Sequence, residues 1–320
     1  MKKLTIIVPC YNEEEVFAET NTVLNGVLDD LKNKKKIALS SNILYVDDGS
    51  KDSTWELISK EFEANEYVVG IKFAGNKGHQ NAVYAGLMEV RKKSDFTITI
   101  DADLQDDVNV IEEMVDKYND GAHVVYGVRN DRTTDSFFKR TSANMFYSVI
   151  KGNGSKAINN AADFRLLSKE VVEELSLYNE FHLYLRGMIP ELGFKQECVY
   201  YKRKERTKGV SKYSLKKMIK LAMDGITSCN DTPLFSFFYI GGILLLFSVF
   251  FLIFTINGVI KKSLYTFFPV MFIILLIGGL LVLGLAFLGQ YIGRTYMESK
   301  RRPRYYVETV LEHKKRGKEE

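Results

Sequence analysis

Two long segments in the C-terminal third of the chain contain no charged residue, and they restrict its possible folds more than any other feature. Residues 234–256 and 264–292 are made almost entirely of apolar side chains. Each is longer than the roughly 20 helical residues that cross the hydrocarbon core of a bilayer. The pattern predicts two transmembrane helices, at about 234–256 and 266–290, with a pair of buried soluble helices as the alternative.

Basic residues flank this apolar pair on its outer sides. Residues 202–220 hold nine Lys or Arg against one acid, and residues 294–320 hold nine against five, whereas the connecting loop offers Lys261 and Lys262. Cytoplasmic segments next to transmembrane helices are enriched in Lys and Arg. We therefore expect a multi-pass protein of the inner or plasma membrane whose large N-terminal part lies in the cytoplasm.

The chain divides into four predicted parts. Residues 1–211 form a cytoplasmic domain, and residues 212–230 form an amphipathic helix in the membrane interface, since Leu215, Met218 and Ile219 follow helical spacing beside lysines. Packing of that helix against the domain is a compatible alternative. Residues 231–293 hold the two transmembrane helices, and residues 294–320 form a basic cytoplasmic tail.

Short β-rich runs alternate with helical patterns in the N-terminal part. Strands are predicted at 4–9, 42–48, 68–73, 96–101 and 123–128, and helices at 13–31, 52–64, 79–92 and 108–119. This alternation indicates an α/β fold, Rossmann-like, with a mostly parallel sheet covered by helices on both faces. In such sheets ligands bind beyond the carboxyl ends of the strands.

Polar residues follow three of these strands, in "PCYNEEE", "DDGSKDS" and "DADLQDD". Asp101 and Asp103 are suited to share a hard divalent cation such as Mg²⁺ or Mn²⁺, although a solvated turn is the common alternative for such a pair. Asp106 and Asp107 are predicted to begin the next helix, where carboxylates suit the helix dipole.

A metal held by two carboxylates keeps positions for substrate phosphates, so this edge predicts a nucleotide ligand. Asp47 and Asp48 could accept hydrogen bonds from its base or ribose. The basic run "YKRKERTKGVSKY" at 201–213 adds Arg206, whose guanidinium is suited to diphosphate oxygens. A membrane-facing basic patch is the alternative for the lysines of this run.

Seven motifs occur in a recognisable order: "TIIVPCYNEEE", "VDDGSKDST", "NKGHQNAVYAG", "DADLQD", "VVYGVRNDR", "ADFRLLS" and "RTKGVSKYS". Together with the two apolar segments, they resemble family 2 glycosyltransferases of the GT-A fold over residues 1 to about 300. Within that family the chain looks most like the polyprenyl-phosphate glycosyltransferases, namely the bactoprenol glucosyltransferases, with dolichol-phosphate mannosyltransferase as a more distant relative.

The resemblance implies roles for residues of these motifs. Asp163 would be the catalytic carboxylate, with Asp103 and Arg206 also acting in catalysis. The nucleotide sugar would be bound by Pro9, Tyr11, Glu13, Asp48, Lys77, Asp101 and Arg129. The metal would be held by Asp101, Asp103 and Gln105. The acceptor and its phosphate would be contacted by Lys139, Arg140, Arg206, Ser211 and Lys212. His79 is expected to begin a helix or to pack, with no catalytic role.

The implied reaction is a metal-dependent, inverting transfer of a sugar to undecaprenyl or another polyprenyl phosphate at the cytoplasmic membrane face, giving a lipid-linked donor for cell-envelope glycosylation. Glucose from UDP-glucose is expected, with N-acetylglucosamine, galactose and mannose as alternatives. A phosphate acceptor is already largely ionised near neutral pH. Asp163 is therefore expected to orient the acceptor or to stabilise positive charge at the anomeric carbon, and an α-linked donor would give a β-linked product.

Other interpretations stay open at this point. The acceptor could be a polysaccharide or a diacylglycerol, and a membrane-anchored nucleotide-sugar binder without catalysis is the alternative from another class. A phosphatase with an Asp nucleophile fits less well, because its Asp-x-Asp motif follows the first strand of its domain. The expected partners are a nucleotide sugar, a polyprenyl phosphate and the membrane, with no nucleic acid, and a homo-oligomer such as a tetramer is compatible with paired transmembrane helices.

Overall fold

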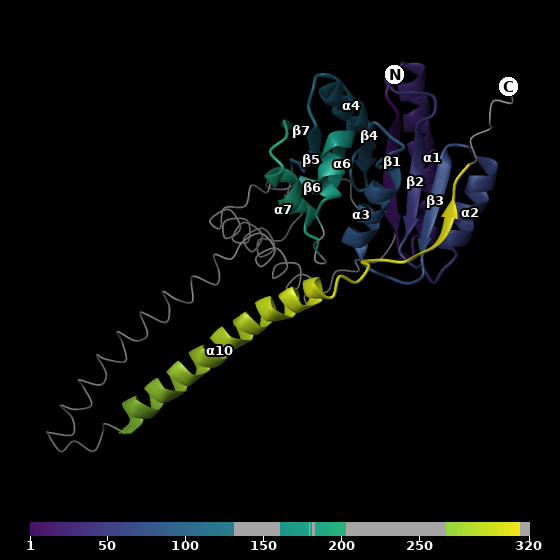
Figure 1. The fold of residues 1–320 in the computed structure, drawn as a ribbon. Coiled ribbons are helices and arrows are strands. Elements are labelled where there is room, and N and C mark those ends of the chain that lie inside the picture. The colour runs from purple at the N-terminus through teal and green to yellow at the C-terminus, as the bar shows by residue number, and fades with distance from the viewer. Residues whose placement is uncertain (131–160, 179, 181–182, 203–266, 314–320) are drawn as a thin grey trace.

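The computed structural model describes residues 1–130, 161–178, 180, 183–202 and 267–313 (Figure 1). Strands and helices alternate along its N-terminal part, as the sequence predicts. They are β1 (Leu4–Cys10), α1 (Glu14–Asn33), β2 (Asn42–Asp47), α2 (Thr54–Ala64), β3 (Val68–Phe73), α3 (His79–Val90), β4 (Phe96–Thr99), the short 3₁₀ helix η1 (Val108–Val110), α4 (Ile111–Asn119) and β5 (Val124–Arg129).

Further elements follow, and the sequence patterns predict only the last helix among them, which falls on the second apolar segment. They are β6 (Ala161–Ser168), α6 (Lys169–Leu175), α7 (Leu185–Glu191), β7 (Gln196–Tyr201), α10 (Phe267–Ser299) and β8 (Val307–Leu311). β8 lies inside the expected basic tail, so that tail contributes a strand to the sheet.

The described strands form one sheet of eight in the order β7-β5-β6-β4-β1-β2-β3-β8. β6 and β8 run antiparallel to their neighbours, and the other pairings are parallel. The mostly parallel α/β class is therefore confirmed. Because β6 and β8 run in the opposite direction, their amino ends lie at the same edge as the carboxyl ends of the other six strands.

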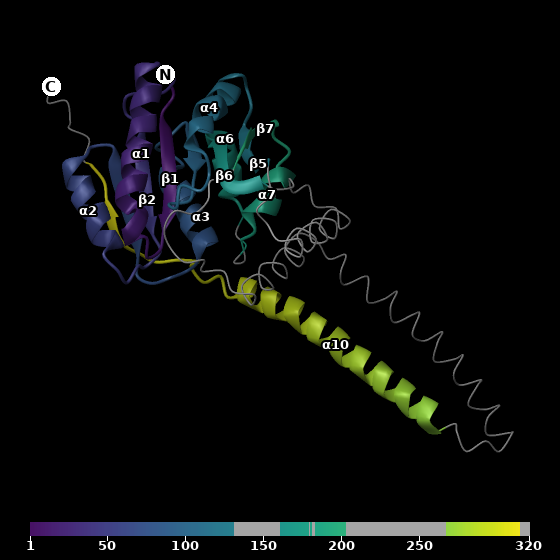
Figure 2. The same ribbon diagram turned by 180° about the vertical axis from the view of Figure 1, so that it is seen from behind.

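Helices cover both faces of the sheet, and Figures 1 and 2 view them from opposite sides. Helices α1, α2 and α4 pack on one face, where they share a core with alternate residues of β1. They contribute Phe17, Leu24, Ile58 and Met114 to this core. α3, α6 and α7 supply the core on the other face. Both faces are apolar, as is usual for strands of a parallel sheet.

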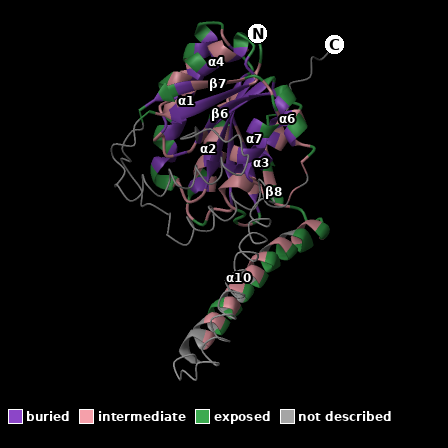
Figure 3. Cartoon of the chain, turned by 90° about the vertical axis from the view of Figure 1, so that its left-hand side faces the viewer, coloured by how far each residue is buried: buried purple, intermediate pink, exposed green. Residues whose placement is uncertain are grey.

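The helix α10 extends away from this domain (Figures 1 and 3). It is 33 residues long and includes the second predicted transmembrane segment. Within the described residues, no helix combines the length and the apolar content needed to cross a bilayer. The first predicted segment, 234–256, and the predicted interface helix, 212–230, lie outside the described residues.

Candidate active site

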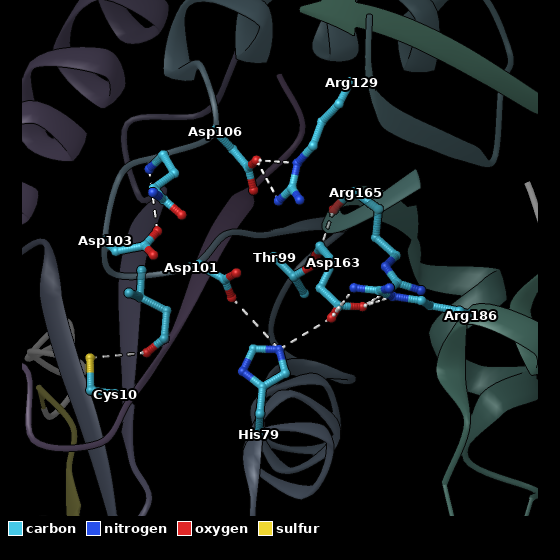
Figure 4. A network of polar contacts seen from close by, with 12 residues as sticks. Cys10, His79, Thr99, Asp101, Asp103, Asp106, Arg129, Asp163, Arg165 and Arg186 are labelled. Carbon is cyan, nitrogen blue, oxygen red and sulfur yellow. Dashed lines mark hydrogen bonds and ion pairs between the residues drawn. The ribbon is translucent and has the colours of Figure 1, made fainter. Parts of the chain in front are cut away.

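Two carboxylates, Asp101 and Asp163, face each other at the carboxyl edge of the parallel strands (Figure 4). Asp101 follows β4, and the N–H of Ile100 donates to the carbonyl of Ile7, which continues the pairing of β4 with β1. Asp163 lies near the start of the antiparallel β6, and its carbonyl accepts a 2.5 Å hydrogen bond from the Thr99 hydroxyl on β4. The pairing of β4 with β6 therefore brings together two acids that are far apart in the sequence.

The imidazole of His79 lies between these two acids. Its Nε2 is 3.6 Å from Oδ1 of Asp101 and 3.5 Å from Oδ2 of Asp163. His79 is the first residue of α3, so its predicted position at a helix start is confirmed. The expectation that it only packs is incomplete, because the structure places it between the two carboxylates.

The charges of this trio shift one another's pKa values. Burial alone would lower the pKa of His79, but Asp101 and Asp163 outweigh it and raise that pKa to about 9. Burial raises the pKa of Asp101 to about 6; His79 opposes this shift, and the carboxylates of Asp163, Asp106 and Asp103 add to it. The protonated imidazole is thus the local counter-charge for both acids.

Two arginines fix the carboxylate of Asp163. Arg186 of α7 donates from Nε to Oδ1 at 3.1 Å and from Nη2 to Oδ2 at 2.9 Å, and Nη2 of Arg165 on β6 also donates to Oδ1. Burial would raise the pKa of Asp163, but Arg186, His79 and Arg165 hold it well below its usual range. Asp163 is consequently an ionised, oriented carboxylate rather than a proton acceptor poised near neutral pH.

Asp103 and Gln105 lie on the loop that leaves β4. The N–H of Gln105 donates to Oδ1 of Asp103 at 3.2 Å, and Leu104 between them takes a left-handed φ of 48°. This turn places the carboxylate of Asp103 on the same loop as that of Asp101 (Figure 4). The predicted pair of acids therefore lies at one strand end, within the same group of polar side chains.

Asp106 and Asp107 differ in role, although the sequence predicts that both begin the next helix. Asp107 does cap η1, since its side chain accepts from the N–H of Asn109. For Asp106 the prediction is wrong: its carboxylate is buried and accepts hydrogen bonds from Nη2 of Arg129 at 2.9 Å and from the Tyr201 hydroxyl at 2.6 Å. A buried acid needs such partners, and they come from β5 and β7.

The same contact defines the position of Arg129. Its guanidinium is held against Asp106 and keeps 25% of the side chain exposed. The predicted contact of Arg129 with phosphate stays a prediction, and such a contact would use the exposed part of a guanidinium that Asp106 already orients.

Asp48 joins the end of β2 to the loop between β3 and α3. Its Oδ1 accepts from the N–H of Lys77 at 2.6 Å, and its Oδ2 accepts from the N–H of Gly78 at 2.8 Å. Gly49 takes a φ of +68°, and a Cβ there would approach Gly75 to 2.7 Å, so two backbones pack directly against each other. The loop that precedes His79 is thereby fixed to the end of β2.

The remaining residues predicted to bind the nucleotide sugar lie around the end of β1. Pro9 is on β1 opposite Val46, and Tyr11 follows the strand. The N–H of Glu13 donates to the Thr54 hydroxyl at 2.8 Å as α1 begins. The edge that carries Asp101 therefore also carries the predicted residues Pro9, Tyr11, Glu13, Asp48 and Lys77. Five predicted residues, Lys139, Arg140, Arg206, Ser211 and Lys212, lie outside the described residues.

No three His, Cys, Asp or Glu side chains in the described part of the chain are placed to hold a metal ion together. Asp101 and Asp103 nonetheless offer the hard oxygen donors that Mg²⁺ and Mn²⁺ prefer, and one or two carboxylates suffice where substrate phosphates complete the coordination. Burial is the main cause of the raised pKa of Asp101, and the nearby carboxylates of Asp163, Asp106 and Asp103 add negative charge around it. An added cation would relieve that crowding, so the residues present fit a divalent metal.

A cavity of about 360 Å³ lies at the opposite edge of the sheet, near the amino ends of the parallel strands. Lys3, Asn42, Tyr67 and Leu311 are among its lining residues. Neither Asp101 nor Asp163 borders it. The cluster of acids and bases at the carboxyl edge, and not this cavity, therefore marks the candidate site.

Sequence reasoning missed His79, Arg165 and Arg186 as members of the site. The motifs "NKGHQN" and "ADFRLLS" contain the first two, but nothing in their spacing shows that they meet Asp163. Arg165 is 1% exposed, and among the described residues its Nε and Nη1 have no hydrogen-bond partner. A charged residue in the middle of a buried strand is the one sequence signal that could have indicated a polar site.

Comparison with known proteins gives independent evidence of the family. Residues 5–176 match glycosyl transferase family 2. The chain is 48% identical to glycosyltransferase YkoT of Bacillus subtilis (strain 168), over 96% of this chain and 92% of that one. It is 36% identical to the bactoprenol glucosyl transferase of Shigella phage SfX, over 96% of this chain and 99% of that one.

Among solved structures, glucosyl-3-phosphoglycerate synthase from Mycobacterium tuberculosis aligns with a TM-score of 0.46 and 13% identity, covering 69% of this chain and 75% of that one. The family match covers the whole region from β1 to α6, including Asp48, Asp101 and Asp163. The mostly parallel sheet, with its acids at the carboxyl edge, is the GT-A arrangement that the motifs predict. The chain is a glycosyltransferase and belongs to glycosyl transferase family 2.

Proposed function

We propose that this glycosyltransferase moves a sugar from a nucleoside diphosphate to the phosphate of a polyprenol, with UDP-glucose as the donor. The relatives named bactoprenol glucosyl transferases, aligned over nearly the full chain, support this acceptor and this sugar. One structural observation carries the proposal: Asp101 and Asp163 face each other across His79. Asp163 is the oriented carboxylate of this group, and Asp101 belongs with Asp103 to an acidic pair.

Asp163 suits an acceptor that needs no strong base. A phosphate monoester has a second pKa of about 6 and is largely ionised at pH 7. The low pKa of Asp163 makes it a poor proton acceptor, whereas its fixed negative charge can orient the acceptor or stabilise positive charge at the anomeric carbon. Direct attack by the acceptor phosphate breaks the bond to the leaving diphosphate and inverts the anomeric centre.

Asp101 and Asp103, with Gln105 beside them, would hold the divalent metal. When bound, Mg²⁺ or Mn²⁺ supplies positive charge next to the departing diphosphate oxygens. Arg206 and Arg129 are the proposed arginine contacts of the same phosphates. Asp48 fixes the loop that carries Lys77, and Pro9, Tyr11 and Glu13 form the neighbouring wall of the proposed nucleotide pocket.

The acceptor explains the proposed membrane attachment. We propose that residues 234–256 and the α10 segment form a transmembrane hairpin, with the catalytic domain in the cytoplasm and residues 212–230 in the interface. Large apolar side chains exposed along α10 support this proposal: Ile274, Leu281, Leu285 and Ile292 are each at least 59% exposed. The basic residues that flank the hairpin agree with the same orientation.

A donor screen tests the proposed function. Membranes containing the full chain are incubated with undecaprenyl phosphate, Mg²⁺ or Mn²⁺, and UDP-glucose, UDP-N-acetylglucosamine, UDP-galactose or GDP-mannose, and lipid-linked sugar is quantified. UDP-glucose should give a β-linked product, and Asp163→Asn should abolish it. A product from another donor alone would overturn the assignment of glucose. An α-linked product would overturn direct displacement, and no product from any donor would overturn the acceptor assignment.

A further inference from the structure

The segment formed by residues 304–313, called here the C-terminal segment, returns from the end of α10 to the edge of the sheet (Figure 1). Its strand β8 pairs antiparallel with β3, with Leu311 opposite Gly70 and Val307 opposite Phe73. The ion pairs Lys72–Glu308, at 3.2 Å, and Lys93–Glu312, at 3.0 Å, accompany the pairing. The amino end of β8 therefore lies at the carboxyl edge of β3, which is the edge that carries the candidate site.

The residues just before β8 contact that edge closely. The Tyr305 ring stacks on Phe73, with a centroid distance of 5.0 Å and an interplanar angle of 9°. The Tyr306 carbonyl accepts a 3.0 Å hydrogen bond from the N–H of Ala74. These contacts fall on the last residue of β3 and on the first residue of the loop at 74–78.

Arg304 anchors the start of the segment. Its Nη2 donates to the Tyr178 carbonyl at 2.6 Å, and its guanidinium lies 4.4 Å from the ring centroid of Tyr84 on α3. The C-terminal segment thus contacts both ends of the loop at 74–78: the end of β3 before it and the helix α3 after it.

The loop at 74–78 leads directly into the site. The N–H groups of Lys77 and Gly78 bind the Asp48 carboxylate, and the next residue is His79, which faces Asp101 and Asp163. A shift of this loop would move Asp48 and His79 together. The contacts of the C-terminal segment restrain that loop from its outer side.

We propose that the C-terminal segment is a positioning element for the active site, in which Tyr305 and Arg304 fix the loop at 74–78 and, through it, Asp48 and His79. Residues 300–303 alone separate this segment from the end of α10 at Ser299. The placement of α10 is therefore coupled to the geometry of the donor pocket. The effect on turnover rests on the proposed function, whereas the effect on the loop does not.

Hydrogen exchange of the full chain in detergent tests this proposal. Tyr305→Ala removes the stacked ring, and the exchange of the Lys77 and Gly78 amides should rise by about two- to tenfold, because the aromatic contact that restrains their loop is lost. Binding of UDP with Mn²⁺ should weaken by a similar factor. Tyr305→Phe keeps the ring and should match the unchanged protein, as should Glu308→Gln, which removes an exposed ion pair from β8 itself.

Arg304→Gln provides a milder second variant, should Tyr305→Ala fail to fold, and it should also raise exchange at Lys77 and Gly78. Unchanged exchange of these amides in the folded variant would overturn the proposal. An equal rise across β1 and β2 would also overturn it, since that result would mean that the segment only stabilises the whole domain. If neither the unchanged protein nor any variant forms lipid-linked sugar, the proposed function is wrong. The comparison of amide exchange would still decide the role of the C-terminal segment.

Discussion

Arg186 donates hydrogen bonds to both carboxylate oxygens of Asp163, with Nε 3.1 Å from Oδ1 and Nη2 2.9 Å from Oδ2. A two-point contact of this kind fixes the rotation of the carboxylate as well as its charge. The guanidinium comes from α7, whereas the carboxylate comes from β6. The orientation of Asp163 therefore depends on how α7 packs against the sheet.

Arg186→Lys should lower kcat about a hundredfold and leave the KM for UDP-glucose within about threefold, because an ammonium group cannot hold both oxygens and a small misplacement can cost that much in rate. Initial rates of lipid-linked sugar formation would measure both constants. Arg91→Lys is the matched control, since Arg91 pairs with Glu173 at 3.6 Å away from the site. An unchanged kcat for Arg186→Lys would contradict the positioning role.

The His79 imidazole should titrate with a midpoint of about 9 in the metal-free protein. Nuclear magnetic resonance of the ring protons would measure it, with His79→Gln used to assign the signal. Asp163→Asn removes one of the two neighbouring charges and should lower the midpoint. A midpoint near the ordinary value of about 6.5 would contradict the ion pairs.

The same shift predicts how stability depends on pH. The folded-state pKa of His79 is raised above its unfolded value, so its contribution is fully present below about pH 6.5 and is lost as the pH rises through about 9. His79→Gln should therefore lower the thermal midpoint more at pH 6 than at pH 10. An equal effect at both values would show that charge is not the cause.

Asp101→Asn and Asp103→Asn should each weaken Mn²⁺ binding in the presence of UDP. A loss of about 10- to 100-fold is expected, the range found even for residues that only support metal ligands. Isothermal titration calorimetry would measure the affinity. Asp107→Asn is the control, because Asp107 caps η1. If all three variants bound Mn²⁺ with equal affinity, Asp101 and Asp103 would not be ligands of the metal.

Gly86→Ala should reduce the stability of the domain by about 1–3 kcal/mol, the usual effect of overpacking a core. A Cβ on Gly86 of α3 would overlap Cγ2 of Ile7 and come within 3.1 Å of Cγ2 of Val46. Gly26→Ala is the control on α1, where nothing lies within 4 Å, and it should stabilise by about 0.5–1 kcal/mol. Thermal unfolding of both variants in detergent would show opposite shifts, and a stable Gly86→Ala protein would contradict the close packing.

The regular part of the domain was readable from the sequence, because β1 to β5 and their helices follow simple apolar patterns. β6 was not, since Asp163 and Arg165 interrupt its apolar pattern. Asp163 is stabilised by His79 of α3 and Arg186 of α7, and Arg165 pairs with Asp163 itself. β8 was hidden in a basic segment, because an exposed edge strand of five residues carries little pattern. The sheet order, with β6 between β4 and β5, depends on long-range pairing that no local pattern encodes.

The site shows the same limit. Asp101 and Asp103 could be identified by their place after a strand, and Asp163 by resemblance to a family. The contact of His79 with both acids requires α3, β4 and β6 to be in place. Asp106 was misassigned because its partners, Arg129 and Tyr201, lie on strands whose adjacency is a tertiary feature.

The late position of β8 in the chain affects how the protein is made. During synthesis, β3 emerges early and has no neighbour on one side until residues 307–311 follow, after every apolar segment has left the ribosome. Unpaired strand edges are sites where chains associate wrongly. The domain can therefore complete its sheet only after residues 307–311 have been synthesised, and ribosome-bound chains that end before residue 307 carry an open edge for a chaperone to shield.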